Sequence, residues 1–472
     1  TGALLGTVAG ESLHYDGLTL LGRVLSVLFD LAIIVLVFLL GRRIFGRWAA
    51  LAGATLVTFS VIHIQLAHFY AVDTPLVFFV LLVCLFAVDV VERQGWRSPL
   101  LCALVFGLGL ATKVSIAPLA LLVIVALVMR WFSAPVATLR SPDLQAQPFA
   151  ERGRAFLVQG LVMLIVAGAT FVVCQPYALI DWRSFWSSVG EQGGMVRGIL
   201  DYPYTRQYLN TPAYWYQVKQ LSLVGLGVPL GLLAFGGLLF ALVRGVLRRY
   251  RLEMLLLSWV LPYFLINGGF QVKFLRYMLP LVPFLALMGG YLLVEAWNWF
   301  NRRAPAPDVW TDDARPLPAS TARDQAEAGR SLMQSHLMGE DGLPPSTGSP
   351  QLSSAGEGTR SIATIPRRGL VALAQRPGMR YAVLGVGGAV LLCTVLWAVA
   401  FVSIYSRDHT RVEASRWIYE NVPAGATLGV EHWDDALPLS LDGERRNDRY
   451  RYLSFNLYEP DTLEKADWLI GH

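Results

Sequence analysis

The chain alternates between long apolar stretches that lack charge and short segments that hold clusters of arginine. A helix needs about 20 apolar residues to cross the hydrocarbon core of a membrane. Ten stretches approach this length: residues 22–40, 47–65, 74–91, 99–112, 114–130, 155–174, 219–243, 252–266, 276–298 and 381–404. The pattern therefore predicts an all-α polytopic membrane protein with about ten transmembrane helices.

Composition agrees with this fold class, because 54% of the 472 residues are apolar and only 15% are charged. Soluble domains carry about 25% charged residues. The net charge of +5 belongs mostly to loops between apolar stretches, so it does not indicate nucleic-acid binding. The four cysteines lie in or beside apolar runs without paired or metal-ligand spacing, which favours a role as small apolar packing residues.

The arginines set the predicted orientation, since short cytoplasmic loops carry an excess of Lys and Arg. If residue 1 is outside, these arginines fall inside: Arg42, Arg43, Arg47, Arg93, Arg97, Arg130, Arg154, Arg244, Arg248, Arg249 and Arg251. We therefore expect a multi-pass protein of the bacterial plasma (inner) membrane with its C-terminus outside.

The chain divides into four predicted parts. Residues 1–300 form the transmembrane core, and 381–404 form the last transmembrane helix. Residues 301–380 are rich in Pro, Ser, Gly and Asp, lack aromatic residues after Trp310, and predict a disordered cytoplasmic insertion. Residues 405–472 begin with helical spacing and continue into a strand at 427–430, which predicts the start of a small extracytoplasmic α/β domain.

The start of the chain predicts a truncation. The first residue is Thr1, and residues 1–22 form neither a signal peptide nor a complete span. We expect that the first membrane span and the first outer loop lie upstream of Thr1.

Several charged residues lie on the predicted outer side, where the loop rule does not explain them: Asp73, Lys113, Arg183, Arg197, Arg206, Lys219, Lys273 and Arg276. Ionisable residues near lipid are costly and indicate functional sites. Asp73, at the start of a span, could cap its helix or hold a divalent cation. His63 and His68 do not share a helix face, so a two-histidine metal site is not favoured.

The outer lysines and arginine suit a phosphate ligand. Lys113 lies at the tip of a hairpin between two apolar runs, where either phosphate binding or snorkelling to the membrane surface explains it. Lys273 and Arg276 are three residues apart, which predicts that they share one face at the start of a helix. A diphosphate or phosphodiester fits this pair, and so do ordinary lipid head groups.

The outer loop from Gln175 to Lys219 is dense in Tyr and Trp with interleaved polar residues. Aromatic planes with adjacent polar groups suit a sugar. An interfacial aromatic belt explains Trp182, Trp186 and Trp215 well, but it explains their polar neighbours poorly.

The stretches AVDTPL, GLATK, QPYALID, DYPYTRQYLNTP and KFLRYMLPLVP, in this order, resemble the bacterial branch of the dolichyl-phosphate-mannose–protein mannosyltransferase family. That family belongs to the C-type glycosyltransferases and is related to the aminoarabinose lipid transferases. The resemblance covers roughly residues 20–300 and 381–440. It implies transfer of a sugar from a polyprenyl-phosphate carrier to a lipid, protein or glycan acceptor at the outer membrane face.

The resemblance also implies roles for particular residues. Asp73 matches the second outer acidic residue, near the donor phosphate or a divalent cation, and Lys113, Lys273 and Arg276 are implied to bind the donor phosphate. The family's general base would lie upstream of Thr1, and neither Glu11 nor Asp16 replaces it. We expect these residues to contact the substrate: His68, Tyr70, Gln175, Tyr177, Asp181, Asp201, Tyr202, Tyr204, Arg206, Gln207 and Tyr208.

Two other functions are compatible with many spans. A transporter or flippase for a lipid-linked substrate commonly shows internal repeats and charges near the membrane midplane, and neither is evident here. A scaffold that only anchors lipids does not explain the polar and aromatic outer loop. The sequence favours the glycosyltransferase, names neither sugar nor acceptor, and leaves dependence on a divalent cation open.

Overall fold

The computed structural model describes residues 15–93, 95–132, 149–248, 250–301, 378–431, 436–441, 446–455 and 468–469. These residues fall into two compact units, one formed by 1–294 with 386–472 and the other by 295–385. Of the second unit, the described part comprises only the end of one helix and the start of another. Most of the predicted insertion at 301–380 therefore lies outside the described residues.

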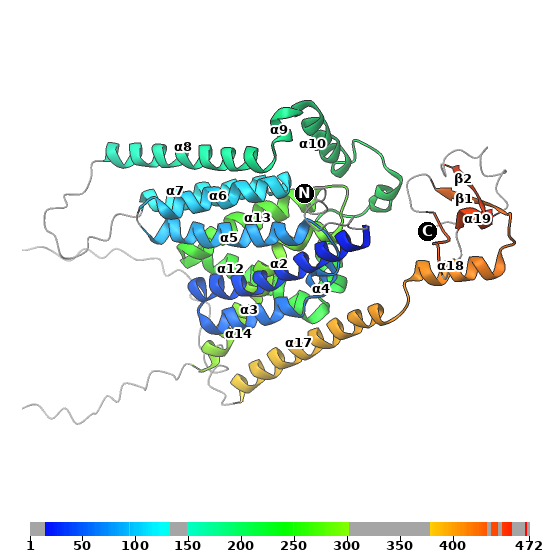
Figure 1. Ribbon diagram of the computed structural model, residues 1–472. Helices are drawn as coiled ribbons and strands as arrows, with labels where there is room; N and C mark the ends of the chain where they lie inside the picture. The colour runs from blue at the N-terminus through cyan, green and yellow to red at the C-terminus, as the bar shows by residue number, and fades with distance from the viewer. Residues whose placement is uncertain are drawn as a thin grey trace, which may run out of the picture. The chain divides into compact units, whose positions relative to one another are not determined.

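Helices make up nearly all of the first unit through residue 294 (Figure 1). The long helices are α2 (Tyr15–Ile44), α3 (Arg47–Thr58), α5 (Asp73–Glu92), α6 (Arg97–Thr112), α7 (Ala120–Phe132), α8 (Phe149–Cys174), α12 (Val228–Arg248), α13 (Arg251–Gly269), α14 (Val282–Asn301) and α17 (Met379–Val402). The predicted polytopic helical fold is thereby confirmed.

Within the described part of the chain, fewer full-length candidate spans are found than the ten predicted. Within the described residues, eight helices are long and apolar enough to cross a membrane, or nine when the bent pair of α3 and α4 (Val61–Ala67) counts as one span. The chain bends by 56° between α3 and α4. The predicted fourth span is α6, whose 16 residues are short for a full crossing.

The predicted span at 219–243 is wrong at its start. Short helical turns, α11 (Trp215–Gln220) and η3 (Leu221–Gly225), precede a break at Gly227, and the span begins only at Val228. Gly227 has a φ of +78°, which glycine adopts without strain and which ends the preceding turn. The apolar run of the sequence is therefore shared between the span and the segment leading to it.

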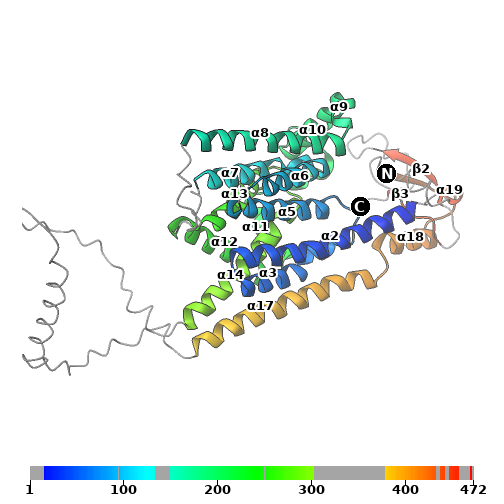
Figure 2. The same ribbon diagram turned by 60° about the vertical axis from the view of Figure 1, so that its left-hand side comes forward.

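Close contacts between small residues set the centre of the bundle. A Cβ on Gly290 of α14 would lie 2.8 Å from the backbone nitrogen of Gly53 in α3, and a Cβ on Gly237 of α12 would lie 2.4 Å from the α14 backbone. Small residues let membrane helices approach closely. Helix α14 is consequently buried from Val282 to Tyr291, whereas α8 packs mainly on α6 and lies at the edge of the bundle (Figures 1 and 2).

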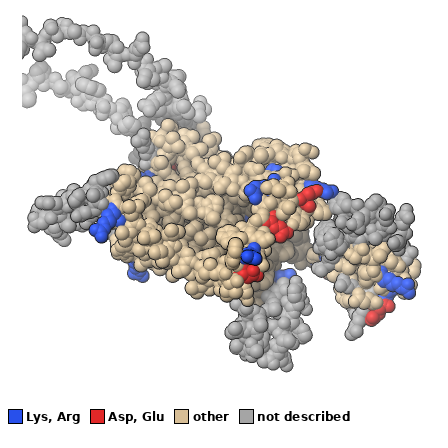
Figure 3. All heavy atoms as spheres, turned by 90° about the horizontal axis from the view of Figure 1, so that it is seen from above, with Lys and Arg blue, Asp and Glu red and all other residues tan. Residues whose placement is uncertain are grey.

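Charge is confined mostly to the two ends of the bundle. On the face shown in Figure 3, the described Lys, Arg, Asp and Glu gather toward the helix ends, with an uncharged surface between them. This pattern is what a lipid environment requires. One end holds the start of α5 together with the segments α9 (Tyr177–Ile180), α10 (Trp182–Val196) and η2 (Pro203–Tyr208). We call this end the loop end.

The C-terminal residues build a small α/β structure. Helix α18 (Thr410–Asn421) and strand β1 (Thr427–Glu431) confirm the predicted helix and strand. Strands β2 (Arg451–Phe455) and β3 (Trp468–Leu469) flank β1 in parallel, in the order β2-β1-β3. The core of this structure includes Ile418, Val422 and Leu428.

Candidate functional site

Asp73 lies at the loop end as the first residue of α5 and is 4% exposed. Its Oδ1 accepts a hydrogen bond from the Nζ of Lys113 at 2.7 Å. Lys113 is an extended residue between α6 and the 3₁₀ turn η1 (Val114–Leu119). The N-cap position of α5 is Val72, without a side-chain cap, so the capping interpretation of Asp73 is wrong. Asp73 is instead the buried partner of an ion pair with the partly exposed Lys113.

The Asp73 carboxylate thus already holds a cation. A divalent ion at Asp73 Oδ1 would have to displace the Lys113 ammonium. In the described part of the chain, no group of three His, Cys, Asp or Glu residues is arranged to bind a metal. The ammonium also lies 5.4 Å from the centre of the Tyr277 ring, a cation–π distance that links the pair to the next segment.

That next segment, residues 270–281, carries the predicted Lys273 and Arg276. Lys273 lies in irregular backbone, whereas Arg276 lies in the 3₁₀ helix η4 (Leu275–Leu281). The two residues therefore do not share a helix face, contrary to the prediction from their spacing. Arg276 is exposed and lies over the rings of Phe274 and Tyr277, with its guanidinium carbon 5.3 and 5.9 Å from their centres.

Lys273 is the least compensated cation of the site. It is 4% exposed, and its Nζ donates to the Gln271 carbonyl at 3.0 Å. No carboxylate of the described residues lies within ion-pair distance of this Nζ, in contrast to Lys113. Burial lowers the pKa of the Lys273 ammonium below its ordinary value. An anion that reached it would restore the environment that an ammonium prefers.

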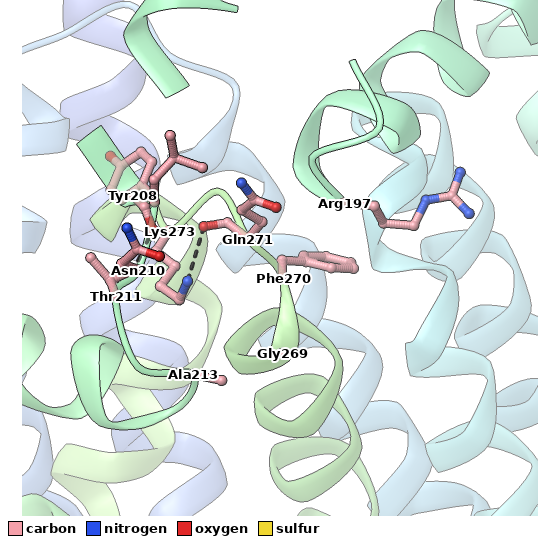
Figure 4. Close-up of a pocket in the computed structure, with 10 residues that line it drawn as sticks. Arg197, Tyr208, Asn210, Thr211, Ala213, Gly269, Phe270, Gln271 and Lys273 are labelled. Carbon is pink, nitrogen blue, oxygen red and sulfur yellow. Dashed lines mark hydrogen bonds between the residues drawn. The ribbon is translucent and has the colours of Figure 1, made fainter. Parts of the chain in front are cut away.

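Lys273 lines a pocket of about 490 Å³ at the loop end (Figure 4). The other lining residues are Arg197, Tyr208, Leu209, Asn210, Thr211, Ala213, Gly269, Phe270 and Gln271. Figure 4 shows Lys273, Asn210 and Thr211 together on one wall. Arg197 lies on the opposite side with its side chain directed away from Lys273, and its Nε donates to the Gly193 carbonyl at 2.7 Å. Its guanidinium thus does not converge on the ammonium.

Backbone contacts hold the two walls of the pocket together. The Val272 nitrogen donates to the Val196 carbonyl at 3.2 Å, and the Tyr214 nitrogen donates to the Gly268 carbonyl at 3.0 Å. Gly198, with a φ of +72°, packs against the Gln271 side chain. These contacts attach the long loop to the segment that carries Lys273, so the pocket is a built feature of this end.

Aromatic rings of the loop continue from the pocket to Arg276. Tyr208 is 6% exposed and meets Phe274 edge-on at 5.5 Å, and Tyr204 stacks on Phe274 at 6.3 Å. Burial raises the pKa of Tyr208 to about 12, so its hydroxyl stays protonated at neutral pH and can donate a hydrogen bond. Tyr208 and Lys273 are the two predicted site residues that line the pocket.

Other predicted substrate residues are engaged within the loop. Asp201 and Arg206 form an exposed bidentate pair at 2.6–3.0 Å, and Arg206 holds the pKa of Asp201 below its ordinary value. Tyr202 donates to Glu191 at 2.5 Å, and this hydrogen bond raises the tyrosine pKa. Asp181 caps α10 by accepting from the Ser184 nitrogen at 3.4 Å.

The remaining predicted residues lie outside the pocket, and two of them, His68 and Tyr70, shortly precede Asp73 in the chain. His68 ends α4 and stacks on Tyr405 at 4.2 Å, and the Tyr70 ring packs over Gly22 of α2. The Gln207 side chain donates to the Tyr204 carbonyl at 2.8 Å. Gln175 follows the end of α8, and Tyr177 is 65% exposed. None of these five lines the pocket.

The comparison of the sequence with protein families gives one match. Residues 18–141 match the family model described as Dolichyl-phosphate-mannose-protein mannosyltransferase. The matched segment contains the AVDTPL and GLATK stretches, so the family resemblance is confirmed there. Lys273 and the loop lie outside it. No curated protein sequence matches the chain.

The solved structures that are similar to this chain include two kinds of protein. ArnT from Cupriavidus metallidurans bound to undecaprenyl phosphate has 17% identity and a TM-score of 0.44, over 87% of this chain and 68% of that one. The Archaeoglobus fulgidus oligosaccharyltransferase AglB in complex with an inhibitory peptide and a dolichol-phosphate has 15% identity and a TM-score of 0.42, over 89% of this chain. The matched region spans 49% of that archaeal protein.

Proposed function

We propose that this chain is a membrane glycosyltransferase that moves a sugar from a polyprenyl-phosphate carrier to an acceptor, and that the reaction takes place at the loop end. Three findings support the proposal. The family model matches the segment with Asp73 and Lys113, the bundle is built for lipid, and the loop end holds cations beside an open pocket.

The main support for the proposal is that Lys273 is buried and has no carboxylate partner among the described residues. A buried ammonium without a carboxylate partner is costly, and such a cation is retained where it meets an anion. Its pocket also offers the side-chain amide of Asn210, which can donate to a phosphate oxygen. A polyprenyl phosphate reaching the loop end from the membrane brings such an anion.

The chemistry needs charge stabilisation more than acid catalysis. The acceptor oxygen attacks the anomeric carbon, the bond from that carbon to the phosphate oxygen breaks, and both bonding electrons leave with the phosphate. Negative charge therefore grows on the phosphate, where fixed cations act most strongly. We assign this role to Lys273 and Arg276. The acceptor proton goes to a general base, a role that we assign to none of the described residues.

Asp73 and Lys113 act as a pair in this proposal. The carboxylate fixes the ammonium at 2.7 Å, beside the Tyr277 ring that also contacts Arg276. Lys113 can then present its ammonium to the phosphate, while Asp73 offsets the cost of partly burying that charge. The Tyr204, Tyr208 and Phe274 rings offer planes on which a sugar can stack.

The side of the membrane follows from the arginine distribution. The loop end lies opposite the arginine-rich loops, so we place it at the outer face of the bacterial inner membrane, with the C-terminus outside. The acceptor would then be an extracytoplasmic lipid, protein or glycan.

A transfer assay tests the proposal. Membranes containing the full-length protein receive a set of radiolabelled polyprenyl-phosphate sugars, and the location of the label is followed. We expect label to leave the carrier for a new molecule, and Arg276→Ala to abolish this. Arg183→Ala, an exposed arginine on α10, serves as the matched control. Label that crosses the bilayer while still on its carrier would show a flippase and contradict the proposal.

A further inference from the structure

One polar pair within the helices has no part in the pocket. Asp30 lies in the candidate span Leu20–Ile44 of α2, and His63 lies in α4. The His63 Nδ1–H donates to Asp30 Oδ1 at 2.7 Å, with the His63 side chain 1% exposed and that of Asp30 17% exposed. His63 Nε2 is buried and has no partner among the described residues, so Asp30 alone fixes the imidazole.

Stability does not explain this pair well. Burying a carboxylate and an imidazole between apolar helices carries a desolvation cost, and replacing a buried polar pair by apolar residues is often neutral or stabilising. What a hydrogen-bonded pair adds over an apolar contact is direction, because it allows only one register of the two helices. The pair is therefore suited to fix a position.

The position it fixes is that of α4. This seven-residue helix bends by 56° from α3 and packs against α2, α5, η3 and η4. Its end is followed within six residues by Asp73. On its other side Ile62, next to His63, lies beside Gly225, which Leu275 also approaches. Leu275 directly precedes Arg276.

We infer that Asp30 and His63 are positioning residues: their hydrogen bond holds α4 in the register that places the Asp73–Lys113 pair and Arg276 correctly relative to each other. The pair touches neither the pocket lining nor Lys273. This inference rests on the proposed function for its kinetic consequence, but the geometric consequence stands by itself.

The experiment uses the full-length protein in membranes with three changes at the pair. Asp30→Leu with His63→Leu removes the hydrogen bond while keeping the interior apolar. Asp30→Asn retains an acceptor for the Nδ1–H. Asp30→His with His63→Asp restores a pair in reverse. Tyr291→Phe is the control, because it removes another buried hydrogen bond, to Glu253 at 3.0 Å, at the opposite end of α13 from the pocket.

The expected result is a split between kinetic constants. The double leucine variant should lose about tenfold or more in kcat, as misplacement of catalytic groups by about 1 Å can cost up to 10²-fold. Its KM for the donor should change less than about threefold, because Lys273 is untouched. Asp30→Asn and the reversed pair should recover most of kcat, and Tyr291→Phe should lower Tm without changing kcat. Wild-type kcat in a folded double leucine variant would overturn the inference.

A distance measurement separates this inference from the proposed function. Spin labels are placed at Phe69 and Ile180, both exposed, after the exposed Cys174 and Cys393 are replaced by serine. One narrow distance distribution is expected in the wild type and in Asp30→Asn, and a shifted or broadened one in the double leucine variant. Identical distributions in all variants would overturn the positioning role, even if no variant transfers sugar. Altered distributions without any transfer in the wild type would contradict only the proposed function.

Discussion

The buried Lys273 and the partly exposed Lys113 of the loop end have opposite surroundings. Lys113 donates to the Asp73 carboxylate at 2.7 Å, whereas among the described residues Lys273 donates only to a backbone carbonyl, at 3.0 Å. A lysine with its own carboxylate can serve the fold without a ligand. A lysine without one is stabilised fully only when an anion arrives. Pairing with a carboxylate, more than position in the sequence, distinguishes a lysine that stabilises the site from a lysine that is available to bind an anionic substrate.

Breaking the paired lysine should have the largest effect. Asp73→Asn leaves the Lys113 ammonium uncompensated, and we expect a loss of about 1–3 kcal/mol in the free energy of unfolding, below the range for fully buried pairs because Lys113 is 27% exposed. Thermal unfolding of the purified protein measures this. Adding Lys113→Met to Asp73→Asn should recover part of the loss. No recovery would mean that the two residues are not coupled.

Breaking the unpaired lysine should affect the substrate instead of the fold. Lys273→Met should raise the donor KM by about 10- to 100-fold, the value of one to two charge-assisted hydrogen bonds. Tm should stay constant or rise, because a buried charge is removed. The transfer assay with varied donor concentration measures this, with Arg183→Met as control. A lowered Tm with unchanged KM would make Lys273 the structural residue and reverse the comparison.

A substitution in the pocket wall opposite Lys273 should have an intermediate effect on stability and on the donor KM. A Cβ on Gly198 would lie 2.1 Å from the Gln271 side chain, and the φ of +72° disfavours alanine. Gly198→Ala should therefore cost about 1–2 kcal/mol in stability and displace Gln271 from the pocket. Gly193→Ala, on the preceding helix with no closer contact than 3.5 Å, is the matched control. Equal Tm and KM in both variants would show that this wall is not rigid.

The pH dependence of donor binding should also distinguish Lys273 from an exposed lysine. Burial lowers the pKa of Lys273, so its ammonium loses its proton at a lower pH than an exposed lysine does. Donor binding should therefore weaken as pH rises through this lowered pKa. Lys273→Arg, which stays protonated, should move that decline to higher pH. Profiles of kcat/KM in the wild type and in the variant test this, and coincident alkaline limbs would assign the decline to another group.

The smallest effect is expected for the exposed pair of the loop. Asp201→Asn should leave Tm and the donor KM nearly unchanged, because exposed ion pairs contribute little. A KM increase of more than about tenfold would restore Asp201 to the substrate-binding residues.

The sequence predicted some of these features and missed others for physical reasons. Apolar length and arginine clusters identified the helices, because lipid imposes both. Spacing failed at 219–243 and at Lys273, since a positive φ at Gly227 and irregular backbone before η4 depend on packing between distant segments. Burial also separated Tyr208 from its exposed neighbours Asp201 and Gln207, although all three share one motif.

The sequence also did not predict which ionisable residues pair with each other. Lys113 lies 40 residues from Asp73, and Asp30 lies 33 residues from His63. Nothing in the local pattern joins either pair. Asn210 and Thr211 fell within a quoted motif, but only the folded pocket shows that they lie on the same wall as Lys273.

The most direct test of the central claim compares two ligands that differ only in the phosphate. Binding of a polyprenyl phosphate and of the polyprenol of equal length is measured for wild-type protein and for Lys273→Met in the same membranes. If Lys273 awaits the phosphate, the wild type should prefer the phosphate by about 10- to 100-fold, and the variant should lose most of that preference. An undiminished preference in Lys273→Met would contradict the claim and place the phosphate at another cation.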